Sequence, residues 1–468
     1  MLFNSQAFLL AFLPISLLIY YACFRQFGQR ASLVVLVSAS LFFYAWWNPL
    51  FLPLLVGSMV VNYAIGNALG RSMNHSAKRG NNVVLLLGLV FNLGLLGYFK
   101  YAGFLVNTVN TFTGKQDIAL NIVLPLGISF FTFQQISYLV DAWRRRAPDY
   151  DILHYSAYVS FFPQLISGPI VRHRELIPQF EQSPTRDGLF ERLGNGAVLF
   201  AIGLFKKVVI ADSLGKFVDP IFAGVSAGQE ITAYAAWMAS AAFSLQVYFD
   251  FSGYSDMALG LALFFGFHLP FNFNAPFAAT DLREFWQRWH MTLTRFLRDY
   301  LFVPIARHRE IPLSRFLAIT ITMLLCGLWH GASWTFVVWG GLHGLGLAVN
   351  TVFSKSRFHL PDPVGWILTI GFFVVCATLF RADSFAVAVE VWQGMMTFEL
   401  PHDAIRGGDV LLVFLAGLIA AKGPTSQSFV FDHLRPTRWL AIATGFLLTA
   451  MVLFVGANHE QEFVYFQF

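Results

Sequence analysis

The chain has 468 residues, of which 56% are hydrophobic and only 12% are charged, and its formal net charge is +5. Soluble proteins contain about 25% charged residues, so this composition excludes a soluble globular protein and predicts a polytopic membrane protein. The positive charge is typical of the cytoplasmic loops of such a protein. Because no basic patch with interleaved stacking aromatics accompanies it, we expect no nucleic-acid partner.

Apolar runs long enough to cross a bilayer recur along the whole chain and predict an all-α membrane fold of about twelve spans. They cover roughly residues 5–22, 31–47, 51–69, 83–99, 120–142, 193–213, 231–250, 313–330, 333–351, 364–381, 409–422 and 438–456. Pro125 and Gly127 predict a kink or break in the fifth run. Arginine and lysine follow the first, third and fifth runs, so the positive-inside rule places those loops in the cytoplasm and both termini on the opposite side.

Three segments do not fit a simple span. Residues 150–180 are apolar but interrupted by proline and glycine, which predicts a re-entrant or interfacial segment. Residues 251–280 are apolar and expected to be split at Gly253, Pro270 and Pro276. Residues 281–300 predict one amphipathic helix at the cytoplasmic interface.

His330 is the first candidate functional residue. It ends an apolar run and follows Trp329. An ionisable group in a membrane span is costly and therefore a functional candidate, and histidine is the usual general base near neutral pH. The alternative is a histidine that hydrogen-bonds a neighbouring helix as part of the packing. A nucleophile pair with Cys326, four residues earlier on the same helix face, is a further alternative.

The run that follows His330 contains Gly340 and Gly344, a small-xxx-small pair that allows two helices to approach closely. We expect this pair to bring its helix against the helix of His330. His343 lies between the two glycines and is expected to be a core histidine.

His290 is the second candidate, on the predicted amphipathic helix. Arg288, Arg295 and Arg298 would form a cationic face near it, suited to a phosphorylated or acidic donor. The alternative is an interfacial helix whose arginines contact lipid headgroups. Glu284 lies four residues before Arg288 and is expected to pair with it.

A polar cluster within an apolar region supplies further candidates. Asp250 and Asp256 lie in FDFSGYSD, and Asn272 and Asn274 follow in NFNAPF; Ser167 lies in another apolar stretch. Polar groups in a membrane protein need partners, so these residues either line a cavity or brace one another.

Several strings resemble the membrane-bound O-acyltransferase (MBOAT) family and, more closely, its alginate O-acetyltransferase branch. They are FDFSGYSDMALG, NFNAPF, FWQRWHMTLTRFLRDY and LWHGASWTFVVWGGLHG, together with PLGISFFTFQQISYLVD, FFPQLISGPIVR and the terminal EFVYFQF. Relatives in this branch acetylate alginate, bacterial cellulose or peptidoglycan. The resemblance implies a single MBOAT transmembrane domain over residues 1–468, with N-terminal spans in 1–148, a catalytic core in 149–350 and C-terminal spans in 351–468.

The resemblance also implies a fold, a site and partners. The fold is a ring of tilted helices around a central tunnel. The near-invariant histidine of the family matches His330, and the second characteristic histidine matches His290. Residues expected to hold the donor or line the tunnel are Trp286, Arg288, Trp289, Arg295, Arg298, Asp250, Asp256, Asn272, Asn274, Trp329 and Ser167. No metal or permanently bound cofactor is expected; acetyl-CoA is the expected donor.

The function implied is passage of acetyl groups across a bacterial inner membrane for O-acetylation of a secreted exopolysaccharide, alginate or cellulose. The expected partners are a periplasmic acetyltransferase of the SGNH type, an exopolysaccharide synthesis and export complex, and membrane lipids. A transporter or channel for acetyl groups or polymer is an alternative from another class. A peptidoglycan or lipid acyltransferase of the same family is the other alternative.

Overall fold

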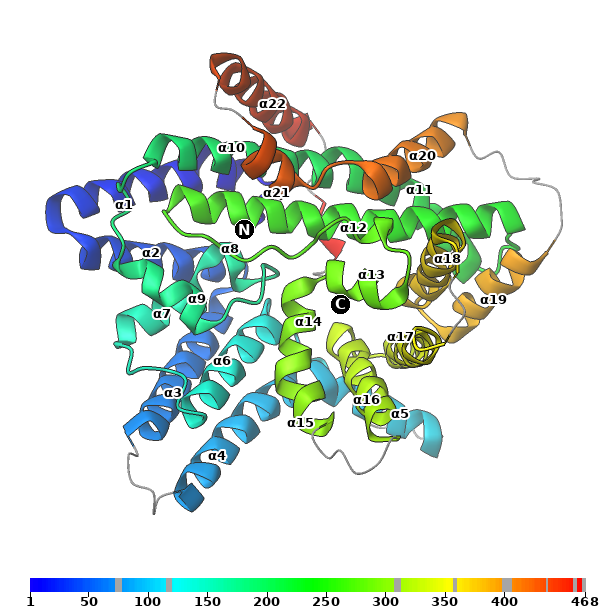
Figure 1. Ribbon diagram of the computed structural model, residues 1–468, viewed down its shortest axis with the longest axis horizontal. Coiled ribbons are helices and arrows are strands. Elements are labelled where there is room, and N and C mark those ends of the chain that lie inside the picture. The colour runs from blue at the N-terminus through cyan, green and yellow to red at the C-terminus, as the bar shows by residue number, and fades with distance from the viewer. Residues whose placement is uncertain are drawn as a thin grey trace. The chain divides into compact units, whose positions relative to one another are not determined.

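The computed structural model describes residues 1–71, 78–114, 120–306, 313–356, 360–397, 406–434, 437–457 and 461–464. Within these ranges every regular element is a helix, which confirms the predicted all-α class (Figure 1). Six of the described helices are long and apolar enough to cross a membrane, and a bent pair, Gly407–Lys422 with Ser426–His433, raises the number to seven if it forms one span. The expected count of about twelve spans stays a prediction.

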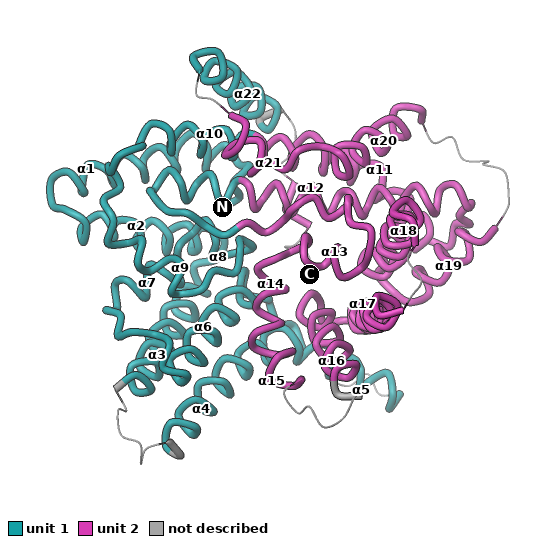
Figure 2. The backbone as a smooth tube through the Cα atoms, in the orientation of Figure 1, with its two compact units in different colours: residues 1–201, 257–270, 435–460 teal, residues 202–256, 271–434, 461–468 magenta. Residues whose placement is uncertain are grey.

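The described chain forms two compact units (Figure 2). Unit 1 consists of residues 1–201, 257–270 and 435–460, and unit 2 consists of residues 202–256, 271–434 and 461–468. All candidate residues except Ser167 lie in unit 2. The proposed division of a single domain into N-terminal spans, core and C-terminal spans stays a prediction.

Unit 1 contains most of the N-terminal helices. They are α1 (Leu13–Phe27), α2 (Gln29–Ala45), α3 (Leu52–Arg71), α4 (Lys78–Leu96), α5 (Ala102–Thr113), α6 (Ile128–Trp143), α7 (Ile152–Ser160), α8 (Phe162–Leu165), α9 (His173–Leu176), most of α10 (Leu189–Phe205), and α22 (Arg438–Ala457). The short helices α7 to α9 fall in the segment where the sequence predicted an irregular course.

Unit 2 carries the candidate site. Its helices are α11 (Asp212–Ser226), most of α12 (Ala233–Phe264), α13 (Leu282–Arg288), α14 (Met291–Leu297), α15 (Val303–Ala306), α16 (Leu313–His330), α17 (Trp334–Phe353), α18 (Asp362–Arg381), α19 (Phe385–Met396), α20 (Gly407–Lys422) and α21 (Ser426–Ser428). Two π-helical turns, Lys206–Ala211 and Arg298–Phe302, continue α10 and α14.

Three helix predictions were wrong in their boundaries. The fifth run is helical only from Ile128, so its start near residue 120 was wrong, but the break expected at Pro125 and Gly127 is confirmed. Gly127 has φ of 73°, and a Cβ there would lie 2.8 Å from the carbonyl oxygen of Leu165. The expected split at Gly253 does not occur, since α12 is one helix of 32 residues. Gly253 instead allows close packing: a Cβ there would lie 2.7 Å from the carbonyl oxygen of Gly203.

The third correction concerns the predicted amphipathic helix, which is two helices rather than one. α13 ends at Arg288 and α14 begins at Met291. His290 lies at the break with φ of 42° and ψ of 52°, a left-handed conformation that non-glycine residues rarely adopt. His290 is therefore on a turn between helices and not on a helix face.

The close approach of α16 and α17 is confirmed, and glycines on both helices make it possible. A Cβ on Gly340 would lie 2.2 Å from the carbonyl oxygen of Met323, and one on Gly327 would lie 2.1 Å from that of Phe336. Real Cβ atoms do not approach backbone oxygens this closely, so either methyl group would force the helices apart. This contact fixes α17 against the helix that ends at His330.

Candidate active site

His330 is the last residue of α16 and is 4% exposed. The chain turns at once into α17, whose first turn is capped by Ser333: its Oγ accepts a hydrogen bond from the backbone N–H of Thr335 at 3.3 Å. Gly331 lies against the ring of Phe336, where a side chain would collide with that ring. The end of one helix and the tight start of the next thus hold the imidazole in one place.

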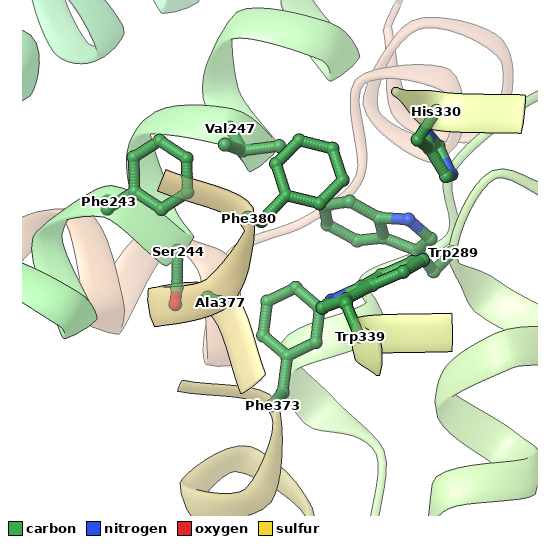
Figure 3. A pocket seen from close by; sticks show the side chains of 9 residues that line it. All are labelled: Phe243, Ser244, Val247, Trp289, His330, Trp339, Phe373, Ala377 and Phe380. Carbon is green, nitrogen blue, oxygen red and sulfur yellow. The ribbon is translucent and has the colours of Figure 1, made fainter. Parts of the chain in front are cut away.

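A pocket with largely aromatic walls adjoins this imidazole (Figure 3). Its lining residues come from α12, the turn before α14, the end of α16, α17 and α18, and they are Phe243, Ser244, Val247, Trp289, His330, Trp339, Phe373, Ala377 and Phe380. The empty volume is about 340 Å³, which includes open space at the mouth of the pocket.

The rings nearest His330 contact it mostly edge to face. The centroid distances are 4.9 Å to Trp329, 5.3 Å to Trp339 and 5.4 Å to Phe380. Ser244 is the lining hydroxyl, and it donates a hydrogen bond to the carbonyl oxygen of Ser240 at 2.8 Å. The histidine is therefore the principal base facing a pocket that otherwise favours apolar groups. Such a site can hold a small acyl group and limit the access of water.

His290 is buried with no exposed surface. Its Nδ1 lies 3.0 Å from Oδ1 of Asn272, and its ring meets that of Phe251 edge to face at 4.7 Å. Burial lowers the pKa of His290 to about 3, so the imidazole is neutral at physiological pH. The sequence predicted that His290 lies beside a cationic surface. The structure instead places it as a neutral histidine in the core of unit 2.

Trp329 connects the two candidate histidines. Its ring centroid is 6.1 Å from that of His290 and 4.9 Å from that of His330. Trp289 and His290 both lie in the turn between α13 and α14, but only Trp289 is among the residues that line the pocket. The structure thus brings both histidines to one aromatic cluster and gives direct access to the pocket only to His330.

The predicted arginine face is largely neutralised by nearby carboxylates. Arg288 pairs with Glu284 at 2.7 Å, as the spacing predicted. Arg298 pairs with Asp299 at 2.8 Å, and Arg295 is half-buried. Arg288 also donates to the carbonyl oxygen of Asn274 at 3.3 Å, so Asn274 acts here through its backbone as a structural brace.

Trp286 donates its Nε1–H to Nδ1 of His343 at 3.3 Å. His343 is fully buried, as the sequence predicted for a core histidine. Its ring lies 4.7 Å from that of Trp339, which in turn contacts His330. Trp286 and His343 therefore support the pocket wall from behind.

Two lysines that the sequence analysis did not single out neutralise the predicted aspartates. Lys207 contacts Asp250 at 2.8 Å and Asp212 at 2.7 Å. Lys206 contacts Asp256 at 2.8 Å, and Ser426 donates to the same carboxylate at 2.6 Å. The signal available in the sequence was the pair of adjacent lysines at the end of an apolar run.

The same charge cluster holds the segment 461–464. Lys207 donates to the carbonyl oxygen of Glu462 at 2.9 Å, and Asp250 accepts from the backbone N–H of Val464 at 3.0 Å. Asp250 and Asp256 therefore brace unit 2, which was one of the two alternatives considered for them. The remaining residues of the EFVYFQF string, 465–468, lie outside the described residues.

Ser167 is buried in unit 1, and its expected place along a tunnel stays a prediction. Within the described ranges no three histidine, cysteine, aspartate or glutamate side chains are grouped as metal ligands would be.

Comparison with known proteins gives a consistent result. The sequence model of the membrane-bound O-acyltransferase family matches residues 126–375. The chain is 36% identical to the peptidoglycan O-acetyltransferase of Helicobacter pylori, covering 100% of this chain and 98% of that protein. It is 39% identical to the probable alginate O-acetylase AlgI of Pseudomonas aeruginosa, covering 90% and 81%, and 36% identical to that of Pseudomonas putida, covering 100% of both. The matched region includes both candidate histidines and seven of the nine pocket residues.

Proposed function

Because this chain belongs to the membrane-bound O-acyltransferase family and is a multi-pass membrane acyltransferase, we propose that it transfers acetyl groups to hydroxyls of a secreted exopolysaccharide, with His330 as the central residue. The observation that carries the proposal is the buried imidazole of His330 facing a pocket with aromatic walls. The pocket accepts a small apolar group, and His330 supplies a base beside it.

In the proposed reaction, the acetyl group of a thioester lies in the pocket. An acceptor hydroxyl attacks the thioester carbon, the C–O bond forms, and the C–S bond breaks. His330 takes the proton of the hydroxyl and passes it to the departing thiolate. The surrounding indole and phenyl rings limit hydrolysis of the thioester by excluding water.

The proposed donor is cytoplasmic acetyl-CoA, and the proposed setting is the bacterial inner membrane. A periplasmic partner of the SGNH type would complete delivery to the polymer. Several relatives are described as probable alginate O-acetylases, which supports alginate or a similar exopolysaccharide such as cellulose as the final acceptor. The full-length similarity to a peptidoglycan O-acetyltransferase makes peptidoglycan the second candidate.

The central test uses bacterial cells that depend on this protein for polymer acetylation. We expect His330→Ala to lower the acetyl content of the polymer by about 100-fold or more, since a general base contributes roughly 10²–10⁴ to the rate. His433→Ala is the matched control, because His433 is exposed and, among the described residues, its side chain bonds the carbonyl oxygen of Ser428 in its own turn. Equal membrane levels of all three proteins are required. Retained acetylation in His330→Ala would overturn the assignment.

A second measurement separates transfer from transport. Purified protein in liposomes receives acetyl-CoA labelled in the acetyl group, and free thiol and vesicle-bound label are measured. Release of CoA thiol that His330→Ala abolishes supports the enzyme. Uptake of label without thiol release would favour a channel. Comparing alginate, cellulose and peptidoglycan fractions from the cells identifies the polymer.

A further inference from the structure

Asn272 makes four side-chain hydrogen-bond contacts in the core of unit 2. It is 2% exposed and lies in the extended segment after α12. Its Oδ1 accepts from the backbone N–H of Thr292 at 3.3 Å and from the hydroxyl of Thr292 at 2.9 Å. Its Nδ2 donates to Oγ of Ser255 at 3.3 Å, and its Oδ1 also lies 3.0 Å from Nδ1 of His290.

These contacts determine which way the amide of Asn272 faces. A backbone N–H can only donate, so the atom of Asn272 facing Thr292 must be the oxygen. The backbone adds a further constraint, because the carbonyl oxygen of Asn272 accepts from the N–H of Met291 at 2.9 Å. The segment around Asn272 and the turn at His290 are therefore held together on both sides of the imidazole.

The orientation of the amide determines the protonation of the histidine. Because an amide oxygen can only accept, Nδ1 of His290 must carry a hydrogen to bond it. The neutral imidazole then has its lone pair on Nε2. His343, by contrast, accepts at Nδ1 from the indole N–H of Trp286, so the two buried histidines have opposite tautomers.

We propose that Asn272 is a positioning residue that fixes His290 as the Nδ1–H tautomer and holds the turn that places Trp289 in the pocket wall. In this form Nε2 of His290 is a hydrogen-bond acceptor and not a donor. This inference rests on the proposed acetyl transfer and assigns a separate task to each histidine: His330 moves the proton, and neutral His290 keeps the turn beside the pocket in place.

The test compares three substitutions in the liposome assay. Asn272→Leu removes the acceptor, and we expect kcat, measured per amount of folded protein, to fall about 10-fold or more. Asn272→Asp keeps the acceptor but adds a negative charge, which favours the imidazolium and raises the pKa of His290. That variant should keep most activity at pH 8.5 and lose it progressively toward pH 6. Ser255→Ala removes only the contact to Nδ2 and should behave like the wild type.

The outcomes separate this inference from the proposed function. If the wild type transfers acetyl and His330→Ala does not, the proposed function holds, and unchanged kcat and pH profiles in both Asn272 variants would overturn the role of Asn272. Nitrogen NMR of protein labelled in histidine, with His290→Gln identifying the signal, gives a readout independent of activity. We expect Nδ1–H in the wild type and a mixture of tautomers in Asn272→Leu; an Nε2–H tautomer in the wild type would overturn the inference.

Discussion

Ring contacts, more than hydrogen bonds, define the surroundings of the pocket. Phe243 and Ser244 lie across the pocket from His330, while Trp339 and Phe380 lie beside it (Figure 3). In the proposed reaction, a rigid phenyl ring opposite the base would limit the length of the acyl chain that the pocket accepts. Selectivity for a short acyl group would then depend on individual side chains.

Phe243→Ala tests that property, because it enlarges the pocket at the end distant from His330. We expect the rate of propionyl transfer relative to acetyl transfer to rise roughly 10-fold, which is the size of effect that one methylene group has in an apolar pocket. The ratio of propionyl-CoA to acetyl-CoA turnover measures it. Phe222→Ala is the control, since Phe222 packs against Phe243 without lining the pocket. An equal ratio in wild type and Phe243→Ala would contradict the expected placement of the acyl group.

The burial of His290 predicts a pH effect on stability. Its pKa is about 3 in the folded protein and about 6.5 in an unfolded chain. The unfolded state therefore binds more protons below pH 6.5, and the folded state loses stability as the pH falls from there toward 3, by up to about 1.4 kcal/mol per pH unit.

His290→Gln should reduce this loss. The measurement is the thermal unfolding midpoint of both proteins in the same detergent at pH 7.5 and pH 5. The difference between the two midpoints should be smaller in the variant. A variant with the same pH dependence as the wild type would contradict a buried, neutral His290.

Among the elements, the pair α16 and α17 shows what the sequence could predict. The spacing of Gly340 and Gly344 indicated a close helix contact, and the structure confirms it because backbone atoms meet there. The break at His290 could not be predicted, since neither glycine nor proline marks it. It depends on Asn272, which is distant in sequence and whose hydrogen bonds hold the turn. The close packing of α12 at Gly253 depends equally on a distant backbone, that of Gly203.

Gly340→Ala should disrupt the site through this contact. The added methyl group would lie 2.2 Å from the carbonyl oxygen of Met323, so α17 must move and carry Trp339 away from His330. We expect a loss of activity of about 10-fold or more and a lower unfolding temperature. Gly341→Ala is the matched control, because its nearest contact is the flexible end of Leu324 at 3.3 Å. Equal effects of the two substitutions would argue against a backbone contact.

At the scale of the whole molecule, unit 2 is assembled from three separated stretches of the chain, and charged groups join them. Lys207 lies in the turn before α11. It contacts Asp212 at the start of α11, Asp250 in α12 and the carbonyl oxygen of Glu462 in the segment 461–464. Composition and hydropathy identified the class of protein, and motif strings identified both histidines. They could not place Lys206 and Lys207 beside the aspartates, because those pairs form only when distant segments meet.

Removing the charge of Lys207 should destabilise unit 2 strongly. Lys207→Met leaves the buried carboxylates of Asp250 and Asp212 without their cation, at an expected cost of about 3–5 kcal/mol. We expect less folded protein in the membrane and a lower unfolding temperature. Adding Asp250→Asn to Lys207→Met removes one of the carboxylates and should restore part of the loss. No improvement in the double variant would show that the pair is not coupled.

The glycine contact between α16 and α17 has a genetic consequence. When two side chains pack, a larger residue on one helix can be compensated by a smaller one on the other. Gly327 and Gly340 face each other's helix backbone, and neither can become smaller. A strain carrying Gly340→Ala should therefore yield no suppressor mutation at Gly327. Activity should return only when the glycine itself is restored, or when a second substitution elsewhere lets α17 shift as a body.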